Sequence, residues 1–203
     1  IRAINAYSKL NYPEKPHLFM EFHCSDIGVK DQSGTMAEII EEFGGGPFRW
    51  SMRPEDQTKL WAARHQAYYA TKALFPGKQG MSTDVCVPIS ELAKAITDTQ
   101  HDLEKFNVIG AIIGHVGDGN FHTLMFSDPN DSKDLELNQM IADRMAKRAL
   151  EVGGTITGEH GIGMGKIKHM AREHGDAMSL MVNLKRSFDP TNIMNPGKMF
   201  NIN

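Results

Sequence analysis

Two histidines flank a glycine-rich stretch in the segment GHVGDGNFH, where His115 precedes the turn residues 117–120 and His122 follows them. If the flanking residues pair as an antiparallel hairpin, both imidazoles can lie on one face near the end of the ladder, where opposed Cβ atoms are about 4.5–5.5 Å apart. That spacing lets two ring nitrogens meet one metal ion at about 2.0–2.1 Å. The alternative is that one or both are ordinary hydrogen-bonded histidines.

A second segment, TGEHGIGMGK, places Glu159 and His160 side by side among four glycines. Glycines lose more backbone entropy on folding than other residues, so such a loop usually exists because something approaches its backbone closely. Glu159 could complete a site of two histidines and one carboxylate, which leaves coordination positions open for a substrate. The alternative is a helix-capping loop with a solvated glutamate.

His160 is the candidate general base. Neighbouring side chains in an extended loop point in different directions, so His160 need not bind the metal that Glu159 binds. A neutral imidazole, with an ordinary pKa near 6.5, can accept a hydroxyl proton at neutral pH, and a metal ion on that hydroxyl would ease the removal of the proton.

The hydrophobic pattern predicts short strands alternating with longer helices. We expect helices to begin or end at the glycine and proline positions near 44–46, 54, 153–154 and 190. The pattern predicts strands over 18–23, 83–88, 108–113 and 121–126, and helices over 33–43, 54–72, 90–106, 134–152 and 176–188. This order indicates an α+β fold: an antiparallel sheet covered by helices on one face, as in a ferredoxin-like substrate or cap domain, with a helical C-terminal segment.

The bulk composition excludes several classes of protein. The 203 residues carry a formal net charge of −3 without a basic stripe, which argues against a nucleic-acid partner. No apolar run reaches the roughly 18 residues of a membrane span. The two cysteines, Cys24 and Cys86, fit reduced thiols inside a cell. No GxGxxG opens a helix after a strand, so a nicotinamide-binding unit is not indicated. The chain begins without Met, from which we expect a fragment of a longer protein.

Three motifs in order, GHVGDGNFH, TGEHGIGMGK and DPTNIMNPGKMF, with STDVCVPIS upstream, resemble the C-terminal domain of FAD-linked oxidases. This group includes D-lactate dehydrogenase and the glycolate oxidase flavin subunit, in the vanillyl-alcohol oxidase superfamily. The resemblance implies that residues 1–203 are the substrate and metal-binding domain of a larger flavoprotein, whose N-terminal FAD-binding domain lies outside this chain. It implies oxidation of a D-2-hydroxy acid, with D-lactate favoured, to the 2-oxo acid.

The resemblance also assigns roles to individual residues. It implies that zinc or manganese is held by His115, His122 and Glu159, and that His160 takes the hydroxyl proton while hydride passes to FAD. Arg64 matches the position expected to bind the substrate carboxylate, although by itself it could be a solvated helix residue. Asn195 and Asn120 are candidates for flavin contacts, and the alternative for residues 195–197 is an ordinary turn without a ligand. Ser82 and Tyr68 replace the Lys and Thr that serve a second carboxylate in 2-hydroxyglutarate enzymes, although Lys78 could substitute.

The implied partners are the hydroxy acid, the protein's own FAD domain and an electron acceptor, which would be a cytochrome, a quinone or an electron-transfer protein. The implied location is intracellular: mitochondrial in a eukaryote, cytoplasmic or membrane-peripheral in a bacterium. We expect the isolated chain to be inactive and to self-associate through the surface that its partner domain would cover. Two other classes remain open, namely a metal-dependent hydrolase that uses the same three ligands and a structural or assembly module without activity.

Overall fold

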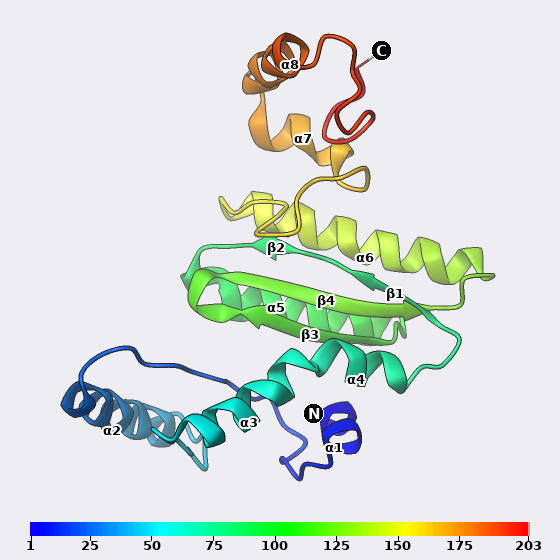
Figure 1. Ribbon diagram of the computed structural model, residues 1–203. Helices are drawn as coiled ribbons and strands as arrows, with labels where there is room; N and C mark the ends of the chain where they lie inside the picture. Colours follow the sequence, from blue (N-terminus) through cyan, green and yellow to red (C-terminus); the bar gives the residue numbers. More distant parts are fainter. Residues whose placement is uncertain (203) are drawn as a thin grey trace. The chain divides into compact units, whose positions relative to one another are not determined.

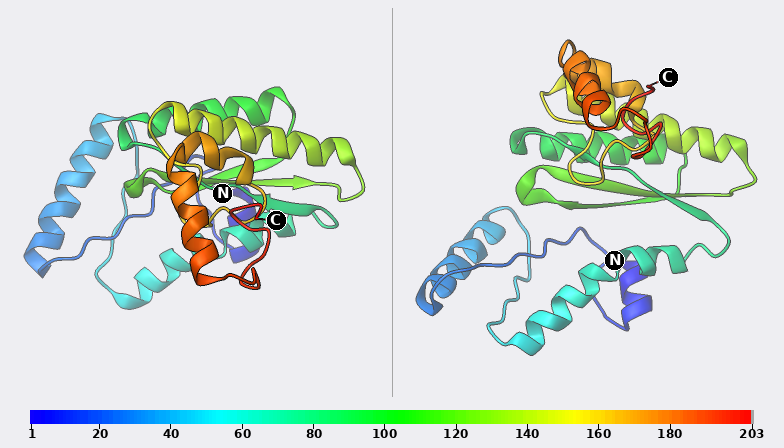
Figure 2. Two further views of the ribbon diagram at one scale, coloured as in Figure 1. Left: turned by 90° about the horizontal axis from the view of Figure 1, so that it is seen from above. Right: turned by 45° about the horizontal axis from the view of Figure 1, so that its top comes forward.

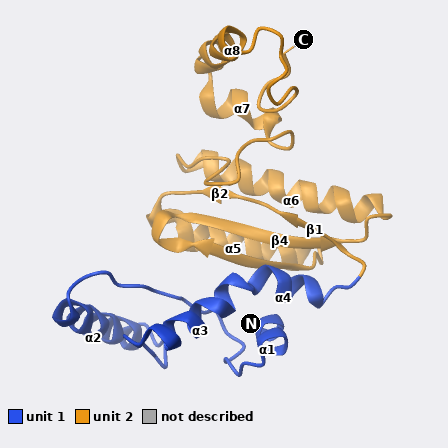
Figure 3. Cartoon of the chain, in the orientation of Figure 1, with its two compact units in different colours: residues 1–76 blue, residues 77–203 orange. Residues whose placement is uncertain are grey.

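The computed structural model describes residues 1–202 and divides the chain into two compact units, Ile1–Pro76 and Gly77–Asn203 (Figure 3). The regular structure of the first unit consists of helices alone, whereas the second unit combines a sheet with helices. Each unit is described below by itself.

The first unit contains α1 (Arg2–Ser8), α2 (Asp26–Glu42), α3 (Pro54–His65) and α4 (Ala67–Ala73) (Figure 1). The Ser25 hydroxyl caps α2 by accepting a hydrogen bond from the amide of Gly28, and Gly44, with φ 69°, follows the end of that helix as predicted. The helix expected over 54–72 is two helices that meet at Gln66.

The strand predicted over 18–23 is wrong, because these residues form no regular structure. A strand needs a hydrogen-bonding partner, and none of residues 1–76 is in a strand. Leu18 is 65% exposed, so the apolar run does not contribute a buried sheet face here. A short apolar run does not by itself distinguish a strand from other extended structure.

The second unit is built on an antiparallel sheet with β4 (Asn120–Ser127) at its centre. β3 (Gly110–His115) pairs with one edge of β4. β1 (Gln79–Ser82) and β2 (Val85–Cys86) follow one another along the other edge, opposite Leu124–Ser127 and Asn120–Phe121 respectively. The strand predicted over 83–88 is therefore an extended segment that begins earlier and is interrupted at Thr83 and Asp84.

Two amphipathic helices, α5 (Ile89–Lys105) and α6 (Ser132–Glu151), cover one face of this sheet (Figure 2). The main core lies between them and the strands, and its largest fully buried members include Phe121, Met125, Ile141 and Met145. Side chains alternate between the faces of a strand, so Phe121 and Met125 place the even-numbered residues of β4 on the opposite face. Asn120 and His122 therefore lie on the face that α5 and α6 leave free.

The C-terminal part of the unit carries α7 (Ile167–His174) and α8 (Ala177–Phe188), followed by a loop to the end of the described chain. A second small core joins this part to α6 through Ala146, Ile156 and Met170, with Phe200 packed against it. The amide of Met199 donates a hydrogen bond to the carbonyl of Gly163, which ties the C-terminal loop to the glycine-rich segment.

The structure confirms the predicted α+β class, the antiparallel sheet covered by helices on one face and the helical C-terminal segment. The short helices α1 and α7 were not predicted. Among residues 1–202, no helix combines the length and the apolar character that crossing a lipid bilayer requires.

Candidate metal centre and adjoining base

The β3–β4 hairpin places both histidines of GHVGDGNFH on the free face of the sheet. His115 pairs with Asn120 and His122 with Ile113, so the histidines are diagonal neighbours rather than a directly opposed pair. Their ring centroids are 5.9 Å apart. The connecting turn requires Gly119, whose φ is 74° and where a Cβ would lie 2.0 Å from the carbonyl oxygen of Val87.

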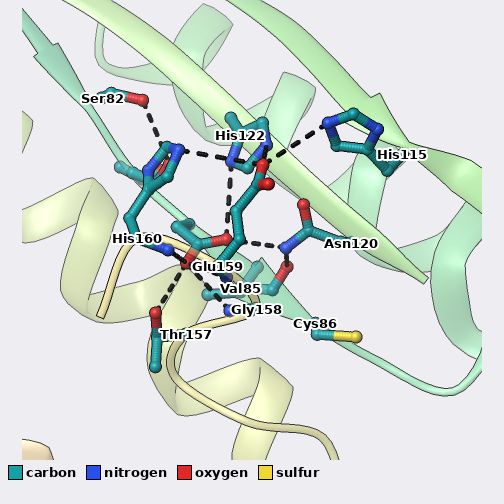
Figure 4. A network of polar contacts seen from close by, with 12 residues as sticks. Ser82, Val85, Cys86, His115, Asn120, His122, Thr157, Gly158, Glu159 and His160 are labelled. Atoms are coloured by element: carbon teal, nitrogen blue, oxygen red, sulfur yellow. Dashed lines mark hydrogen bonds and ion pairs between the residues drawn. The ribbon is translucent and has the colours of Figure 1, made fainter. Parts of the chain in front are cut away.

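Three side chains from two distant segments converge at this face (Figure 4). The Nε2 atom of His122 lies 2.8 Å from Oε1 of Glu159, and the Nε2 atom of His115 lies 3.4 Å from the same oxygen. His122 is the most deeply buried of the three, with 8% of its side chain exposed, whereas about half of each of the other two side chains is exposed. The group is therefore open toward solvent on one side.

His160 adjoins this group without sharing its centre. Its ring stacks on that of His122 with 4.5 Å between the centroids and 12° between the planes. Its Nε2 atom lies 3.9 Å from Oε1 of Glu159, and 44% of the side chain is exposed. An accessible imidazole beside the converging ligands can exchange a proton with a bound molecule.

The environment of His122 favours the neutral imidazole. Burial lowers the pKa of His122, and the neighbouring His160 lowers it further, which outweighs the opposite influence of the Asp84 and Glu159 carboxylates. A neutral ring keeps a lone pair on one nitrogen, as a metal ligand must. The Nε2 atom faces Glu159 and His115, while Nδ1 faces Asp84 at 3.5 Å.

Asp84 is a member of this site that the sequence motifs did not single out. Its side chain is 1% exposed, and its carboxylate accepts hydrogen bonds from both sequence motifs, including one from Asn120 of the hairpin and three from amides of the glycine-rich loop. Burial alone would raise the pKa of Asp84, but these bonds and that of the Thr157 hydroxyl together lower it well below its usual range. The available signal was a charged residue within the apolar run TDVCVP.

The donor set fits a divalent metal. One ligand atom from each of His115, His122 and Glu159 lies within 4.8 Å of the others, and two imidazoles with one carboxylate suit zinc or manganese. A carboxylate behind the second nitrogen of a ligating histidine is the usual supporting arrangement, and Asp84 occupies that place. One ligand atom from each of Asp84, His122 and His160 also lies within 4.8 Å of the others, but the Asp84 oxygens are buried and already accept hydrogen bonds, so we favour the first set.

The two asparagines lie in different settings. Asn120 is 5% exposed, and its Nδ2 donates to Oδ1 of Asp84 and to the carbonyl of Val85, so it belongs to the network behind the site. Asn195 is exposed in the loop after α8, with φ 49°. The predicted flavin contacts of both residues stay predictions.

Arg64 lies near the C-terminal end of α3 in the first unit, partly exposed. Within residues 1–202 its guanidinium forms no hydrogen bond or ion pair, which leaves it available to a ligand. Its predicted contact with a substrate carboxylate stays a prediction.

The residues considered for a second carboxylate lie apart along β1. Ser82 ends the strand opposite Leu124, whereas Lys78 precedes its first residue, Gln79, which pairs with Ser127. At about 3.3 Å per residue, Lys78 is more than 10 Å farther from the site end of the sheet. Its Nζ lies 3.8 Å from the Asp134 carboxylate at the start of α6. This placement weakens the case for Lys78 as a substitute binding group.

Residues 1–199 match the family model described as "FAD linked oxidases, C-terminal domain". The chain therefore belongs to this family, as the three motifs predicted. The match spans both units and nearly the whole chain.

Named relatives agree with this assignment. The chain is 46% identical over 203 residues to "Probable D-lactate dehydrogenase, mitochondrial" of Danio rerio, which covers 100% of this chain and 41% of the relative. It is 38% identical to the mitochondrial "D-lactate dehydrogenase (cytochrome)" of Arabidopsis thaliana, over 98% of this chain and 35% of the relative. It is 35% identical to "Glycolate oxidase subunit GlcD" of Bacillus subtilis, over 98% of this chain and 42% of the relative. The chain thus spans about two fifths of the length of these relatives.

Proposed function

We propose that this chain is the substrate and metal-binding domain of a larger FAD-dependent dehydrogenase that oxidises a D-2-hydroxy acid, with D-lactate the favoured substrate, to the 2-oxo acid. The observation that carries the proposal is the convergence of His115, His122 and Glu159 at one face of the sheet. The named D-lactate dehydrogenases and glycolate oxidase subunit support the substrate class, and the family of FAD-linked oxidases supports the flavin.

Each candidate site residue has a distinct role in this proposal. His115, His122 and Glu159 hold the metal, and His160 accepts the hydroxyl proton of the substrate at its ring nitrogen. Arg64 binds the substrate carboxylate through its guanidinium fork. A metal held by these ligands would supply polarisation of the substrate hydroxyl, and the flavin of the partner domain would supply the hydride acceptor. In this proposal Asn195, which is exposed in the loop after α8, contacts the flavin.

The substrate preference follows from the residues available for a second carboxylate. Ser82 carries no charge, and Lys78 lies toward the other end of the strand beside Asp134. Lys166 lies nearer the site, but its ammonium group donates to the Asp84 carbonyl and lies 3.8 Å from the Asp84 carboxylate, so its charge is already engaged. None of these three residues therefore offers a free charged partner to a distal carboxylate. We propose a monocarboxylate such as D-lactate for this reason.

The remaining part of the protein would supply the FAD-binding domain and cover apolar side chains that are exposed here. Large exposed apolar residues of the C-terminal segment include Leu180, Leu184, Phe188, Ile193 and Met194. Such a surface usually marks an interface, and without its partner it promotes self-association. We propose a mitochondrial location if the source is a eukaryote, and a cytochrome, quinone or electron-transfer protein as acceptor.

The activity is tested by dye reduction in the full-length protein, meaning a protein of the length of its relatives, with D-lactate, L-lactate, glycolate and D-2-hydroxyglutarate. We expect the fastest turnover with D-lactate. Absence of flavin absorption together with hydrolytic turnover would instead support the metal-dependent hydrolase. Absence of both flavin and metal binding would support a structural module.

Two substitutions separate the roles of the histidines. We expect His160→Ala to retain metal, since this ring adjoins the ligands without completing the set, and to lower kcat by about 10²–10⁴-fold, as removal of a general base does. His122→Ala should lose the metal as well. An equal loss of metal in both variants would contradict this division of roles, and metal content is measured by atomic emission after dialysis.

A further inference from the structure

Asp84 lies where the edge of the sheet is interrupted. β1 ends at Ser82 and β2 begins at Val85, so Thr83 and Asp84 fall between two paired segments. Thr83 still contacts β4, because its amide donates to the Thr123 carbonyl at 3.0 Å and its hydroxyl accepts from the Thr123 amide at 2.9 Å. Asp84 itself pairs with no residue of β4, and its carboxylate lies buried among the site residues.

One oxygen of this carboxylate holds the loop that carries Glu159 and His160. Oδ2 accepts hydrogen bonds from the amides of Gly158 at 2.9 Å, Glu159 at 2.9 Å and His160 at 2.8 Å. The Thr157 hydroxyl donates to the same oxygen at 2.6 Å. Three consecutive amides that share one acceptor fix the direction of the backbone, and with it the directions in which both side chains leave the loop.

The other oxygen faces the hairpin. Oδ1 accepts a hydrogen bond from Nδ2 of Asn120 at 2.7 Å and lies 3.5 Å from Nδ1 of His122. That ring nitrogen is buried and forms no close hydrogen bond within the described chain, although the backbone of Thr83 is a second acceptor beside the ring. A carboxylate can only accept, so Asp84 favours a proton on Nδ1, whereas Glu159, 2.8 Å from Nε2, favours one on Nε2. A metal ion on Nε2 would displace that second proton, and Asp84 would then be the carboxylate that supports the remaining proton on Nδ1.

We propose that Asp84 is the positioning residue of this site: one buried carboxylate holds the Glu159–His160 loop and supports the His122 tautomer that can bind metal. The proposal rests on the proposed function for the identity of the ligands and the base. The loop half of the proposal, however, concerns backbone amides and can be measured without any metal.

Asp84→Asn tests both halves with little change in size. An amide side chain has one oxygen and one NH₂ group, so either orientation breaks one half of the arrangement. With the oxygen toward the loop, the NH₂ group faces the Asn120 amide and favours a His122 tautomer with its proton on Nε2. With the NH₂ group toward the loop, the amides of 158–160 lose their acceptor.

The experiment uses the full-length protein after removal of metal by a chelator. Zn²⁺ binding is measured by calorimetry, and hydrogen–deuterium exchange is followed for peptides that cover 157–161. For Asp84→Asn we expect Zn²⁺ affinity to fall by about 10–100-fold, as for other residues that support metal ligands, or exchange at 158–160 to accelerate by at least about tenfold, or both. Wild-type values of both quantities would overturn the proposal.

Asp102→Asn is the matched control. Asp102 is equally buried in the same unit, on α5, and its carboxylate is held by Arg144 and Arg148. It contacts none of the site residues in the described chain. We expect Asp102→Asn to leave Zn²⁺ affinity and exchange at 158–160 unchanged even if the protein is less stable, and a loss equal to that of Asp84→Asn would reduce Asp84 to a general stabilising role and overturn the proposal.

Thr157→Val covers the case in which Asp84→Asn fails to fold. It removes one donor and keeps the carboxylate, so exchange at 158–160 should accelerate by about 3- to 10-fold, the equivalent of one hydrogen bond. Unchanged exchange in this variant would overturn the loop half. If the wild-type protein binds no Zn²⁺ and no Mn²⁺, the metal centre of the proposed function fails, and the exchange data still decide whether Asp84 holds the loop.

Discussion

Gly158→Ala should disrupt the site through a single added methyl group. A Cβ at this position would lie 1.9 Å from Nδ2 of Asn120 and 3.2 Å from Oδ1 of Asp84. Restoring ordinary van der Waals contact requires the Asn120 amide to move by about 1.5 Å. That movement breaks the hydrogen bonds from Nδ2 to Asp84 at 2.7 Å and to the Val85 carbonyl at 3.0 Å.

The magnitude follows from these two bonds. Each contributes about 0.5–1.5 kcal/mol, or somewhat more to the charged acceptor, and buried donors left unpaired add to the cost. The alanine also stabilises by about 0.4–1 kcal/mol, because it restricts the unfolded chain. The net expected loss is about 1.5–3 kcal/mol, which corresponds to exchange of the β4 amides about 10- to 150-fold faster when exchange reports opening of the sheet.

Gly165→Ala supplies the control in the same loop. No atom beyond its own neighbours lies within 4 Å of a Cβ at this position, and its φ is outside the left-handed region. We expect it to be neutral or slightly stabilising, and to retain metal. Hydrogen–deuterium exchange of the peptide covering β4, in the full-length protein, measures both variants. If Gly158→Ala exchanges at the same rate as Gly165→Ala, the packing of Gly158 against Asn120 does not hold the site, and the reasoning is wrong.

Three further predictions concern charged residues. Burial alone would raise the pKa of Asp102, but hydrogen bonds from Arg144 and Arg148 lower it on balance. Its stabilising contribution is therefore complete above the unfolded-state pKa near 3.9 and is lost as pH falls through the lower folded-state value. Asp102→Asn should reduce the unfolding free energy by about 1–3 kcal/mol at neutral pH and by less near pH 3 in urea titrations; an equal difference at both pH values would contradict the assignment. Arg64→Lys should raise KM for D-lactate about tenfold in the full-length protein, because a lysine cannot bind a carboxylate with two parallel hydrogen bonds; an unchanged KM would remove Arg64 from the substrate site. Lys78→Ala should leave KM for D-lactate and D-2-hydroxyglutarate within about twofold of wild type, and a selective rise for the dicarboxylate would show that Lys78 does reach the substrate.

The hairpin and its two histidines were predictable because the local sequence contains all the information required. A glycine that adopts positive φ lies between two apolar runs, and the strands it joins are adjacent in the chain. The approach of Glu159 to His122 was predicted from residue type and from the resemblance alone. The structure shows what holds the two segments together: the Asp84 carboxylate accepts hydrogen bonds from both, although Asp84 is distant from both in sequence.

Asp84 and the interrupted edge were not predictable from hydrophobic pattern. The run TDVCVP is typical of one continuous strand, and its interruption depends on the Thr83 hydroxyl taking the place of the Thr83 carbonyl as acceptor for the Thr123 amide of β4, which is a tertiary contact. The opposite error occurred at 18–23, where an apolar run had no strand to pair with. The number of strands agrees with the prediction, but the strand predicted at 18–23 is absent, and β1 (Gln79–Ser82) lies before the strand predicted at 83–88.

The division into two units has a practical consequence for spectroscopy. Both tryptophans of the chain, Trp50 and Trp61, belong to Ile1–Pro76, and the proposed metal ligands all belong to Gly77–Asn203 (Figure 3). Intrinsic indole emission therefore reports directly on the helical unit that carries Arg64, while cobalt absorption bands in place of zinc would report on the sheet unit. Two optical signals recorded on one sample could follow the unfolding of each part without any attached label.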